Sequence, residues 1–270
     1  MPNKIKVLFI GDVVGSPGRS GVRHLVPEIV ESYGIDLVIA NGENAAGGIG
    51  ITPQVADELL RNGVHVLTSG NHVWAKKEIL GYLSGSERIL RPANYPPGLP
   101  GRGGTVIHTR GGDPIGVFNL QGRVYMDNLD CPFRVAEKEI ETLKKEAKVV
   151  ILDFHAEATS EKVALGWFLD GRISAVLGTH THIQTADERI LPHGTAYITD
   201  VGMTGSVDSV IGMKKEIAIE RFLTQVPRKL EVAKRDIQLQ GVVLEIDKES
   251  GGCVRIKRVQ AWLEKESTRD

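Results

Sequence analysis

The sequence predicts an α/β protein in which buried strands deliver polar residues at their carboxyl ends. Short β-branched and apolar runs alternate with segments of helical period along much of the 270 residues. Five of these runs end in potential metal ligands, and the clearest is Ile173 to Leu177, which precedes Gly178-Thr179-His180-Thr181-His182. A predicted hairpin near residue 110 interrupts the alternation, which indicates a second sheet or a sheet edge.

The composition is that of a globular protein with a full core, at 41% hydrophobic and 25% charged residues. Because 33 Lys and Arg stand against 34 Asp and Glu, we expect no long nucleic acid and no membrane as a partner. No run approaches the ~20 apolar residues of a membrane span. Cys131 and Cys253 are too few for a disulfide framework and match no zinc pattern.

The chain is predicted to be a single cytoplasmic domain over residues 1–270. Near the N-terminus, Val7 to Ile10 form a short apolar run before an acid, which is typical of a first strand and not of a signal peptide. No linker, internal repeat or low-complexity segment divides the chain.

The first part of the chain predicts strands that are each followed by a helix. The predicted strands are Ile5 to Ile10, Asp36 to Ala40 and Val64 to Thr68, and the predicted helices are Gly18 to Tyr33, Thr52 to Arg61 and Lys76 to Leu83. Residues 84–104 are rich in Gly and Pro and predict an irregular loop.

Local signals fix several of these boundaries. Pro27 should kink the first helix and Gly34 should close it. Thr52 followed by Pro53 is a strong helix start, with an N-cap and a proline at the first helical position. The glycine-rich stretch Val13 to Gly18 fits neither dinucleotide nor P-loop spacing, which argues against such a site.

The second part of the chain mixes hairpins with further strand–helix pairs. Predicted strands are Thr105 to His108, Ile115 to Leu120, Val149 to Leu152, Ile173 to Leu177, Ala196 to Thr199, a surface-facing strand Glu216 to Leu223, and a last hairpin of Gln240 to Ile246 with Cys253 to Trp262. Predicted helices are Arg134 to Ala147 and Ser160 to Leu169, and predicted loops are 121–133 and 200–205.

Five strand ends carry the candidate functional residues, which are Asp12, Glu43 with Asn44, Asn71 with His72, His155, and His180 with His182. In an open α/β sheet the carboxyl ends of the strands meet at one edge, so we expect these side chains to converge. At spacing two, two imidazoles leave an extended strand end on one side, about 6–7 Å apart at the backbone.

Each residue taken alone also has a structural explanation. Asp12 is equally suited to cap the next helix, Asn44 and Asn71 to form turns, and His155 to be a hydrogen-bonded core residue. The histidine pair after Leu177 is equally typical of a polar loop. The joint pattern, with four of the eight histidines at predicted strand ends, favours a metal site over these separate explanations.

The ligand types indicate which metal ions the site would bind. A mixed oxygen and nitrogen set without thiolate suits Mn, Fe or Zn and is too rich in imidazole for a Mg or Ca cage. Seven candidate ligands exceed the four of a single zinc site. They fit two ions that share a carboxylate, and two ions ~3.5–4 Å apart are the arrangement used for displacement at phosphorus.

The motifs resemble those of the calcineurin-like metallophosphoesterase superfamily. That pattern has an Asp after strand one, an acid after strand two, Gly-Asn-His after strand three, a His, and then Gly-His-x-His. Here the motifs are Gly11-Asp12, Gly42-Glu43-Asn44, Gly70-Asn71-His72, His155 and Gly178-Thr179-His180-Thr181-His182. Residues 153–166 and 178–203 are similar in particular to the YmdB-like 2′,3′-cyclic-nucleotide phosphodiesterases of bacteria, and the resemblance covers essentially the whole chain.

Two departures from the wider superfamily are features of this branch. The chain has Asp12-Val13-Val14 where Asp-x-His is usual, and Gly42-Glu43-Asn44 where Gly-Asp-x-x-Asp is usual, with the Asn taken as a substitute ligand. They bear on metal affinity and preference at the first site.

The resemblance implies a metallophosphoesterase-type β-sandwich of two mixed sheets flanked by helices (αββα). It implies that one metal ion is held by Asp12, Glu43, Asn44 and His182, and a second by Glu43, Asn71, His155 and His180, with Glu43 bridging. The ions would be Fe or Mn, with Zn as an option. A bridging hydroxide would open 2′,3′-cyclic nucleotides to 3′-nucleotides, with 3′,5′-cyclic nucleotides as further candidate substrates. His72 would protonate the leaving ribose oxygen, and structural support is its alternative role.

Other parts of the function stay open in the sequence. Thr181, Thr204 and the backbone N–H groups of Gly202 to Gly205 are candidate phosphate contacts, and Arg123 and Tyr125 are candidates for nucleotide contact or for packing. Rival readings are a phosphomonoesterase, an RNA phosphodiesterase, and a regulatory nucleotide-binding protein with slow or no turnover. The C-terminal hairpin and exposed loops favour a homo-oligomer.

Overall fold

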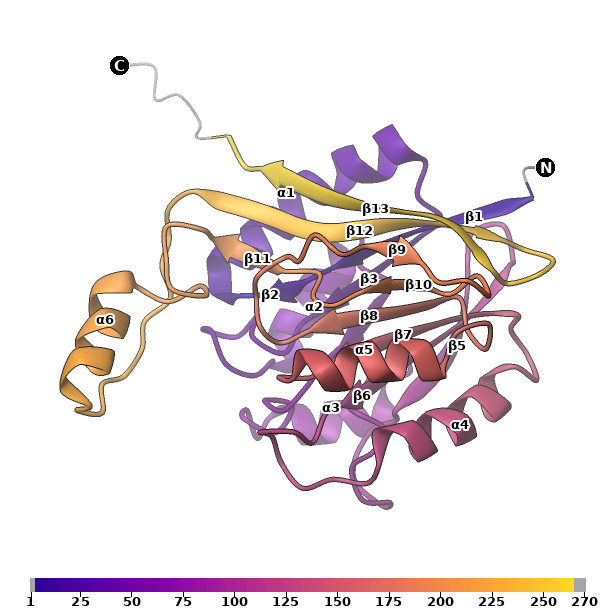
Figure 1. Ribbon diagram of the computed structural model, residues 1–270. Helices are drawn as coiled ribbons and strands as arrows, with labels where there is room; N and C mark the ends of the chain where they lie inside the picture. Colours follow the sequence, from indigo (N-terminus) through magenta and orange to yellow (C-terminus); the bar gives the residue numbers. More distant parts are fainter. Residues whose placement is uncertain (1–2, 265–270) are drawn as a thin grey trace.

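Two β-sheets pack face to face, with helices on both outer faces, in the computed structural model (Figure 1). The structure describes residues 3–264, so positions 1–2 and 265–270 of the predicted 1–270 domain lie outside the described residues. Both sheets contain parallel and antiparallel pairs, which confirms the predicted sandwich of mixed sheets. No helix within residues 3–264 is long and apolar enough to cross a bilayer.

The first sheet has the strand order β2-β11-β12-β1-β3-β4, with β13 paired to β12. Its strands are β1 (Lys4–Ile10), β2 (Asp12–Val13), β3 (Leu37–Asn41), β4 (Val66–Thr68), β11 (Met203–Ser206), β12 (Ile237–Asp247) and β13 (Cys253–Trp262). Strand β1 is parallel to β3 and antiparallel to β12, so segments from opposite ends of the chain form its centre. Strands β12 and β13 form the predicted last hairpin, while the short strands β2 and β11 lack a period long enough to predict.

The second sheet has the order β5-β6-β7-β8-β10-β9. Its strands are β5 (Gly104–His108), β6 (Pro114–Gln121), β7 (Val149–His155), β8 (Ala175–Thr179), β9 (Arg189–Ile190) and β10 (Ala196–Ile198). The first two form the predicted hairpin, and β6, β7, β8 and β10 run parallel. Strand β7 continues three residues beyond the predicted end at Leu152, so His155 is its last residue.

Apolar residues on alternate sides of the strands form separate cores. In β1, Val7 and Phe9 face the second sheet, where they meet residues such as Ile151, whereas Leu8 and Ile10 face the helices. Because both faces of each sheet are covered, the central strands are apolar throughout, and their sequences lack the alternation of a half-exposed strand.

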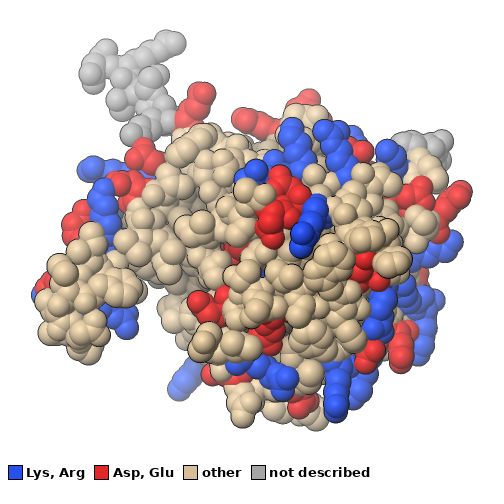
Figure 2. Space-filling view, viewed as in Figure 1, with Lys and Arg blue, Asp and Glu red and all other residues tan. Residues whose placement is uncertain are grey.

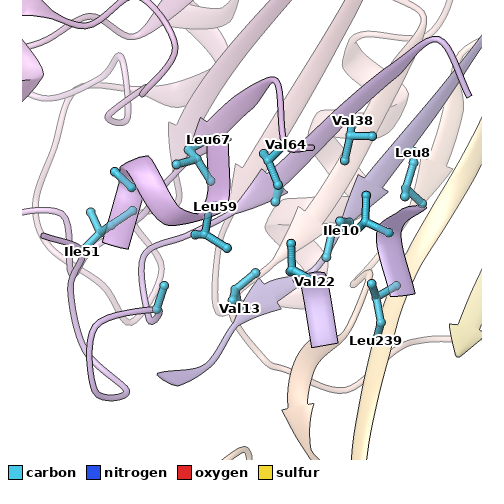
Figure 3. Packing of buried hydrophobic residues seen from close by; sticks show 14 of the residues in the cluster. Leu8, Ile10, Val13, Val22, Val38, Ile51, Leu59, Val64, Leu67 and Leu239 are labelled. Carbon is cyan, nitrogen blue, oxygen red and sulfur yellow. The ribbon is translucent and has the colours of Figure 1, made fainter. Parts of the chain in front are cut away.

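The helices cover the two outer faces. Helices α1 (Gly15–Tyr33), α2 (Pro53–Arg61) and α3 (Ile79–Gly85) cover the first sheet, and Figure 3 shows Val22 of α1 and Leu59 of α2 in this core. Helices α4 (Pro132–Leu143) and α5 (Thr159–Phe168) cover the second sheet. Thr52 caps α2 by accepting a hydrogen bond from the Val55 N–H at 3.4 Å, and Gly34 closes α1 at φ 66°, both as predicted.

One predicted strand is wrong: Glu216 to Leu223 lie in helix α6 (Lys215–Thr224). The segment stands apart from both sheets (Figure 1), so no strand edge is available to satisfy extended backbone. Lys, Glu, Ala, Arg and Leu favour a helix there. Helix α3 likewise begins at Ile79, three residues later than predicted, because 71–78 form turns.

Candidate metal centre

The predicted candidate residues converge at the carboxyl ends of strands from both sheets. Asp12 follows β1, and Glu43 and Asn44 follow β3. Asn71 and His72 lie just beyond β4, His155 ends β7, and His180 and His182 follow β8. The structure therefore brings all eight predicted residues into one cluster, which neither sheet forms alone.

His155 lies at the centre of the first group of side chains. Its Nε2 atom is 3.1 Å from Glu43 Oε1, 3.0 Å from Asn71 Oδ1 and 2.9 Å from His180 Nδ1. Ligand atoms of Glu43, His155 and His180 all lie within 4.8 Å of one another. These are the residues that the resemblance assigned to the second ion.

The second group surrounds an unsatisfied carboxylate oxygen. Asp12 Oδ1 is buried without a hydrogen-bond partner, 3.7 Å from His182 Nε2. The Asn44 amide nitrogen lies 3.2 Å from that imidazole nitrogen and donates to Glu43 Oε1 at 3.1 Å. The Asn44 oxygen faces His72, so a half-turn of the amide, which exchanges groups of similar shape, would turn oxygen toward His182.

Burial and neighbouring charges shift the pKa values of the buried acids in opposite directions. Burial raises the pKa of Asp12, and the nearby His182 and His155 only partly oppose this. Burial would also raise the pKa of Glu43, but His155 and His72 outweigh it and hold that pKa well below its usual range. Glu43 is therefore a carboxylate at neutral pH.

The pKa values of the two central histidines, His155 and His180, are also shifted in opposite directions. Burial lowers the pKa of His155, but Glu43, Asp12 and Asp153 outweigh it and raise that pKa to about 9. Burial, together with the charge of His155, lowers the pKa of His180 to about 3. The site therefore favours a positive charge between the Glu43 carboxylate and the neutral His180 imidazole. In this structure a proton on His155 supplies that charge. This electrostatic preference, the unsatisfied Asp12 oxygen and the nitrogen and oxygen donors fit transition-metal cations.

Residues beneath the cluster fix the orientation of His155. The Thr179 hydroxyl donates to Asp153 Oδ1 at 2.7 Å, so its oxygen accepts from His155 Nδ1 at 2.9 Å. Asn41 donates to the other Asp153 oxygen at 2.9 Å, and burial raises the Asp153 pKa to about 7. His155 therefore presents Nε2 to the cluster, as metal-ligating histidines do when a partner holds the other nitrogen. Sequence reasoning missed these three residues, which are polar side chains within or at the end of apolar strands.

The expected geometry of the histidine pair is wrong. Strand β8 ends at Thr179, and His180 and His182 have φ values of 102° and 66°, so they do not lie in extended backbone. This left-handed turn aims His180 Nδ1 at His155 and His182 Nε2 at Asn44. Gly178 permits the turn to pack closely, because a Cβ there would lie 1.8 Å from the Thr199 carbonyl oxygen.

His72 lies at the edge of the cluster, in a turn that follows β4. Its Nδ1 is 2.9 Å from Asn44 Oδ1 and 3.3 Å from Glu43 Oε1, and its backbone N–H donates to Glu43 Oε2 at 3.1 Å. The His72 side chain is 33% exposed, whereas that of Glu43 is buried. Solvent or a substrate can therefore reach His72 and not Glu43. Gly70 before it allows close approach, since a Cβ there would lie 2.1 Å from the His155 ring.

The candidate phosphate contacts at Thr181 and residues 202–205 make hydrogen bonds within the protein, and residues 203–205 belong to strand β11 and not to the predicted loop. Thr181 Oγ1 donates to Asp200 and Thr204 Oγ1 to the Gln240 carbonyl, at 2.7 and 3.4 Å. The N–H groups of Gly202 and Met203 are also bound, to Asp200 and Gln240 side chains. These four donors are thus occupied by internal hydrogen bonds, and their contact with a phosphate stays a prediction.

The 121–133 loop borders the cluster. It leaves β6 at Gln121, which pairs with His155, and the Gly122 N–H donates to the His155 carbonyl at 2.9 Å. Glu161 accepts from the Arg123 N–H at 3.1 Å, and Tyr125 is 89% exposed at φ 63°. Contact of Arg123 or Tyr125 with a nucleotide stays a prediction.

The chain is similar to known proteins in both sequence and structure. A family model described as YmdB-like protein matches residues 8–259. The 2′,3′-cyclic-nucleotide 2′-phosphodiesterase of Bacillus subtilis (strain 168) is 49% identical over 255 residues, which is 94% of this chain and 96% of that protein. The crystal structure of a hypothetical protein from Thermus thermophilus has a TM-score of 0.90 at 44% identity, covering 96% of this chain and 100% of that one. The crystal structure of a novel phosphatase from Mycoplasma pneumoniae has a TM-score of 0.90 at 36% identity, covering 97% and 95%.

Proposed function

The chain belongs to the YmdB-like family, and from this premise we propose that it is a metal-dependent phosphodiesterase that hydrolyses 2′,3′-cyclic nucleotides to 3′-nucleotides. The observation that carries the proposal is the convergence of Glu43, His155 and His180 beside the unsatisfied Asp12 oxygen. The name of the Bacillus subtilis relative supplies the substrate class.

The residues divide into two sets around a shared carboxylate. Asp12, Asn44 and His182 would hold one ion, and Asn71, His155 and His180 the other. Glu43 would be shared by the two sets, because its Oε1 lies near His155 of one set and accepts from Asn44 of the other. The donor set favours Fe or Mn, with Zn as an option. When bound, two such ions acidify a shared water and neutralise charge on phosphoryl oxygens.

The protein's own residues would complete the chemistry. Opening the ring breaks the bond between phosphorus and the ribose 2′ oxygen, and that oxygen must gain a proton. We assign the donor role to His72, whose Nδ1 is held by Asn44 while the ring edge is exposed. Asp153 and Thr179 hold His155 in the orientation that presents Nε2.

Hydrolysis of 2′,3′-cyclic AMP, with 3′,5′-cyclic AMP alongside, tests the substrate class. Protein reconstituted with Mn or Fe should convert the 2′,3′ ring to 3′-AMP, resolved by chromatography, and chelation should abolish the reaction. Release of phosphate from 3′-AMP would instead indicate a phosphomonoesterase. If well-metallated protein turned over neither cyclic compound, the proposal would fail, and a regulatory nucleotide-binding role would replace it.

We further propose that the substrate is a small nucleotide and not a long nucleic acid. On the face in Figure 2, Lys and Arg are interspersed with Asp and Glu, and no single-sign patch extends across it. A cytoplasmic location and a single domain over 1–270 also stay proposals.

We propose that the chain self-associates through the exposed apolar residues of α6. Ile219, Phe222 and Leu223 are 51%, 74% and 80% exposed on a helix that stands apart from the sandwich (Figures 1 and 2). Apolar surface of this kind is typical of interaction sites. We expect light scattering to give a multiple of the 29.4 kDa chain mass and Phe222→Glu to reduce it. A monomeric wild type would contradict the proposal.

A further inference from the structure

A fully buried ion pair lies directly behind the two histidines that follow β8. Lys162 of α5 and Asp200 are 1% and 0% exposed, and Lys162 Nζ donates to Asp200 Oδ2 at 2.9 Å. Replacing a buried ion pair by packed apolar residues is often neutral or stabilising. Stability alone therefore does not account for a pair at this position.

Asp200 holds the residue between the two histidines. Its Oδ2 accepts from the Thr181 N–H at 3.0 Å and from the Thr181 hydroxyl at 2.7 Å. Its Oδ1 accepts from the Gly202 N–H at 2.8 Å. One carboxylate thus satisfies four donors, and three of them converge on a single oxygen.

The residues flanking Thr181 need such a restraint. His180 and His182 have φ values of 102° and 66°, a region that side chains with a Cβ rarely adopt. Such conformations persist only where the surroundings fix them on several sides. Each histidine also depends on this turn for its aim, toward His155 and toward Asp12 respectively.

Asp200 is itself held rigidly. The Thr185 hydroxyl accepts from its backbone N–H at 2.9 Å, and its carbonyl accepts from the Thr185 N–H at 3.0 Å. The Val201 N–H donates to the Gly178 carbonyl at 2.9 Å, which ties this loop to the end of β8.

We propose that Asp200, charge-balanced by Lys162, is a positioning residue that locks the Thr181 turn and so sets His180 and His182 for metal binding. This inference rests on the proposed metal centre. It does not make Asp200 a ligand, because its oxygens face Lys162, Thr181 and Gly202. Residues that orient metal ligands typically change metal affinity by about 10–100-fold when replaced.

The experiment separates positioning from stability with a double variant. Asp200→Asn alone leaves the Lys162 charge unpaired and should lower the unfolding temperature. Asp200→Asn with Lys162→Met removes both charges and should regain stability. The double variant should still bind Mn²⁺ about 10–100-fold more weakly than wild type, because one amide oxygen cannot replace two carboxylate oxygens.

Two further measurements keep the test decisive. Thr181→Val should weaken Mn²⁺ binding while Thr181→Ser, which keeps the hydroxyl, restores it. In metal-free protein, amide hydrogen exchange of a peptide spanning 178–185 should be faster in the double variant than in wild type. Ile140→Ala, in the core under α4, is the control that lowers stability and leaves Mn²⁺ affinity unchanged.

Wild-type Mn²⁺ affinity and wild-type exchange in a folded double variant would overturn the inference. If the double variant does not fold, the Thr181→Val and Thr181→Ser pair decides, and equal affinities in both would overturn it. If wild type binds no Mn²⁺, the metal centre of the proposed function fails instead. The exchange measurement then still decides whether Asp200 holds the turn.

Discussion

Replacing Glu43 by glutamine should lower kcat/KM for 2′,3′-cyclic AMP by at least ~10³-fold, because metal ions contribute several kcal/mol to such reactions. Glu43 is fully buried, and its oxygens meet His155, the Asn44 amide and the His72 N–H. Glutamine keeps the volume but has one acceptor oxygen and no charge. It also removes the first of the three carboxylates that together raise the pKa of His155 to about 9, and so weakens the attraction for a cation at that point.

Metal content and a charge-matched control make this result specific. Elemental analysis should give two ions per chain in wild type and fewer in Glu43→Gln. Glu58 of α2 forms a partly exposed ion pair with Arg19 of α1, and Glu58→Gln should change neither metal content nor turnover. Two ions and wild-type turnover in Glu43→Gln would refute the bridging role.

The sequence could identify the residues that converge because each lies at or just after the end of a buried strand, while their binding of metal stays a prediction. Apolar runs such as Val64 to Thr68 mark strands locally, and the carboxyl ends of parallel strands meet at one edge. No ligand needed a long-range contact to be identified. The edge rule brings together the strand ends of one sheet, and the face-to-face packing of the two sheets joins the two sets into one cluster.

What the sequence could not predict depends on residues far apart in the chain. The left-handed turn at His180 and His182 is held by Asp200, and nothing in the local period indicates it. The pairing of β1 with β12 joins residues more than 200 positions apart. Helix α6 was mistaken for a strand because an alternating pattern is uninformative where no sheet edge lies beside it.

The orientation of the candidate ligands depends on buried polar residues, which the hydrophobic periodicity of the sequence does not reveal. Asp153 lies two residues before His155 in the same strand, and a strand period places both on one face. That spacing is the one signal that could have identified Asp153 as a partner of the cluster. Its connection through Thr179 needs the neighbouring strand β8, which only the fold supplies.

Replacing His72 by alanine should lower kcat for 2′,3′-cyclic AMP by about 10²–10⁴-fold, the range for loss of a general acid. Metal content should stay at the wild-type value, since the side chain is at the edge of the cluster and is partly exposed. The ribose 2′ oxygen is a poor leaving group without a proton. A phosphodiester with a nitrophenolate leaving group needs no such proton, so its hydrolysis should be far less affected.

A second substitution distinguishes an acid from a structural support. His72→Gln keeps an amide group that can pair with the Asn44 amide in either of its orientations, in place of the 2.9 Å contact of His72 Nδ1, but it cannot release a proton. If His72 only holds Asn44 in place, glutamine should rescue turnover of both substrates. If it is the acid, glutamine should fail on the cyclic nucleotide and succeed on the activated ester. His108→Ala, on the exposed end of β5, controls for loss of an imidazole elsewhere. An equal rate loss on both substrates in His72→Ala would contradict the acid role, because the nitrophenolate ester would then depend on the same side chain for another reason.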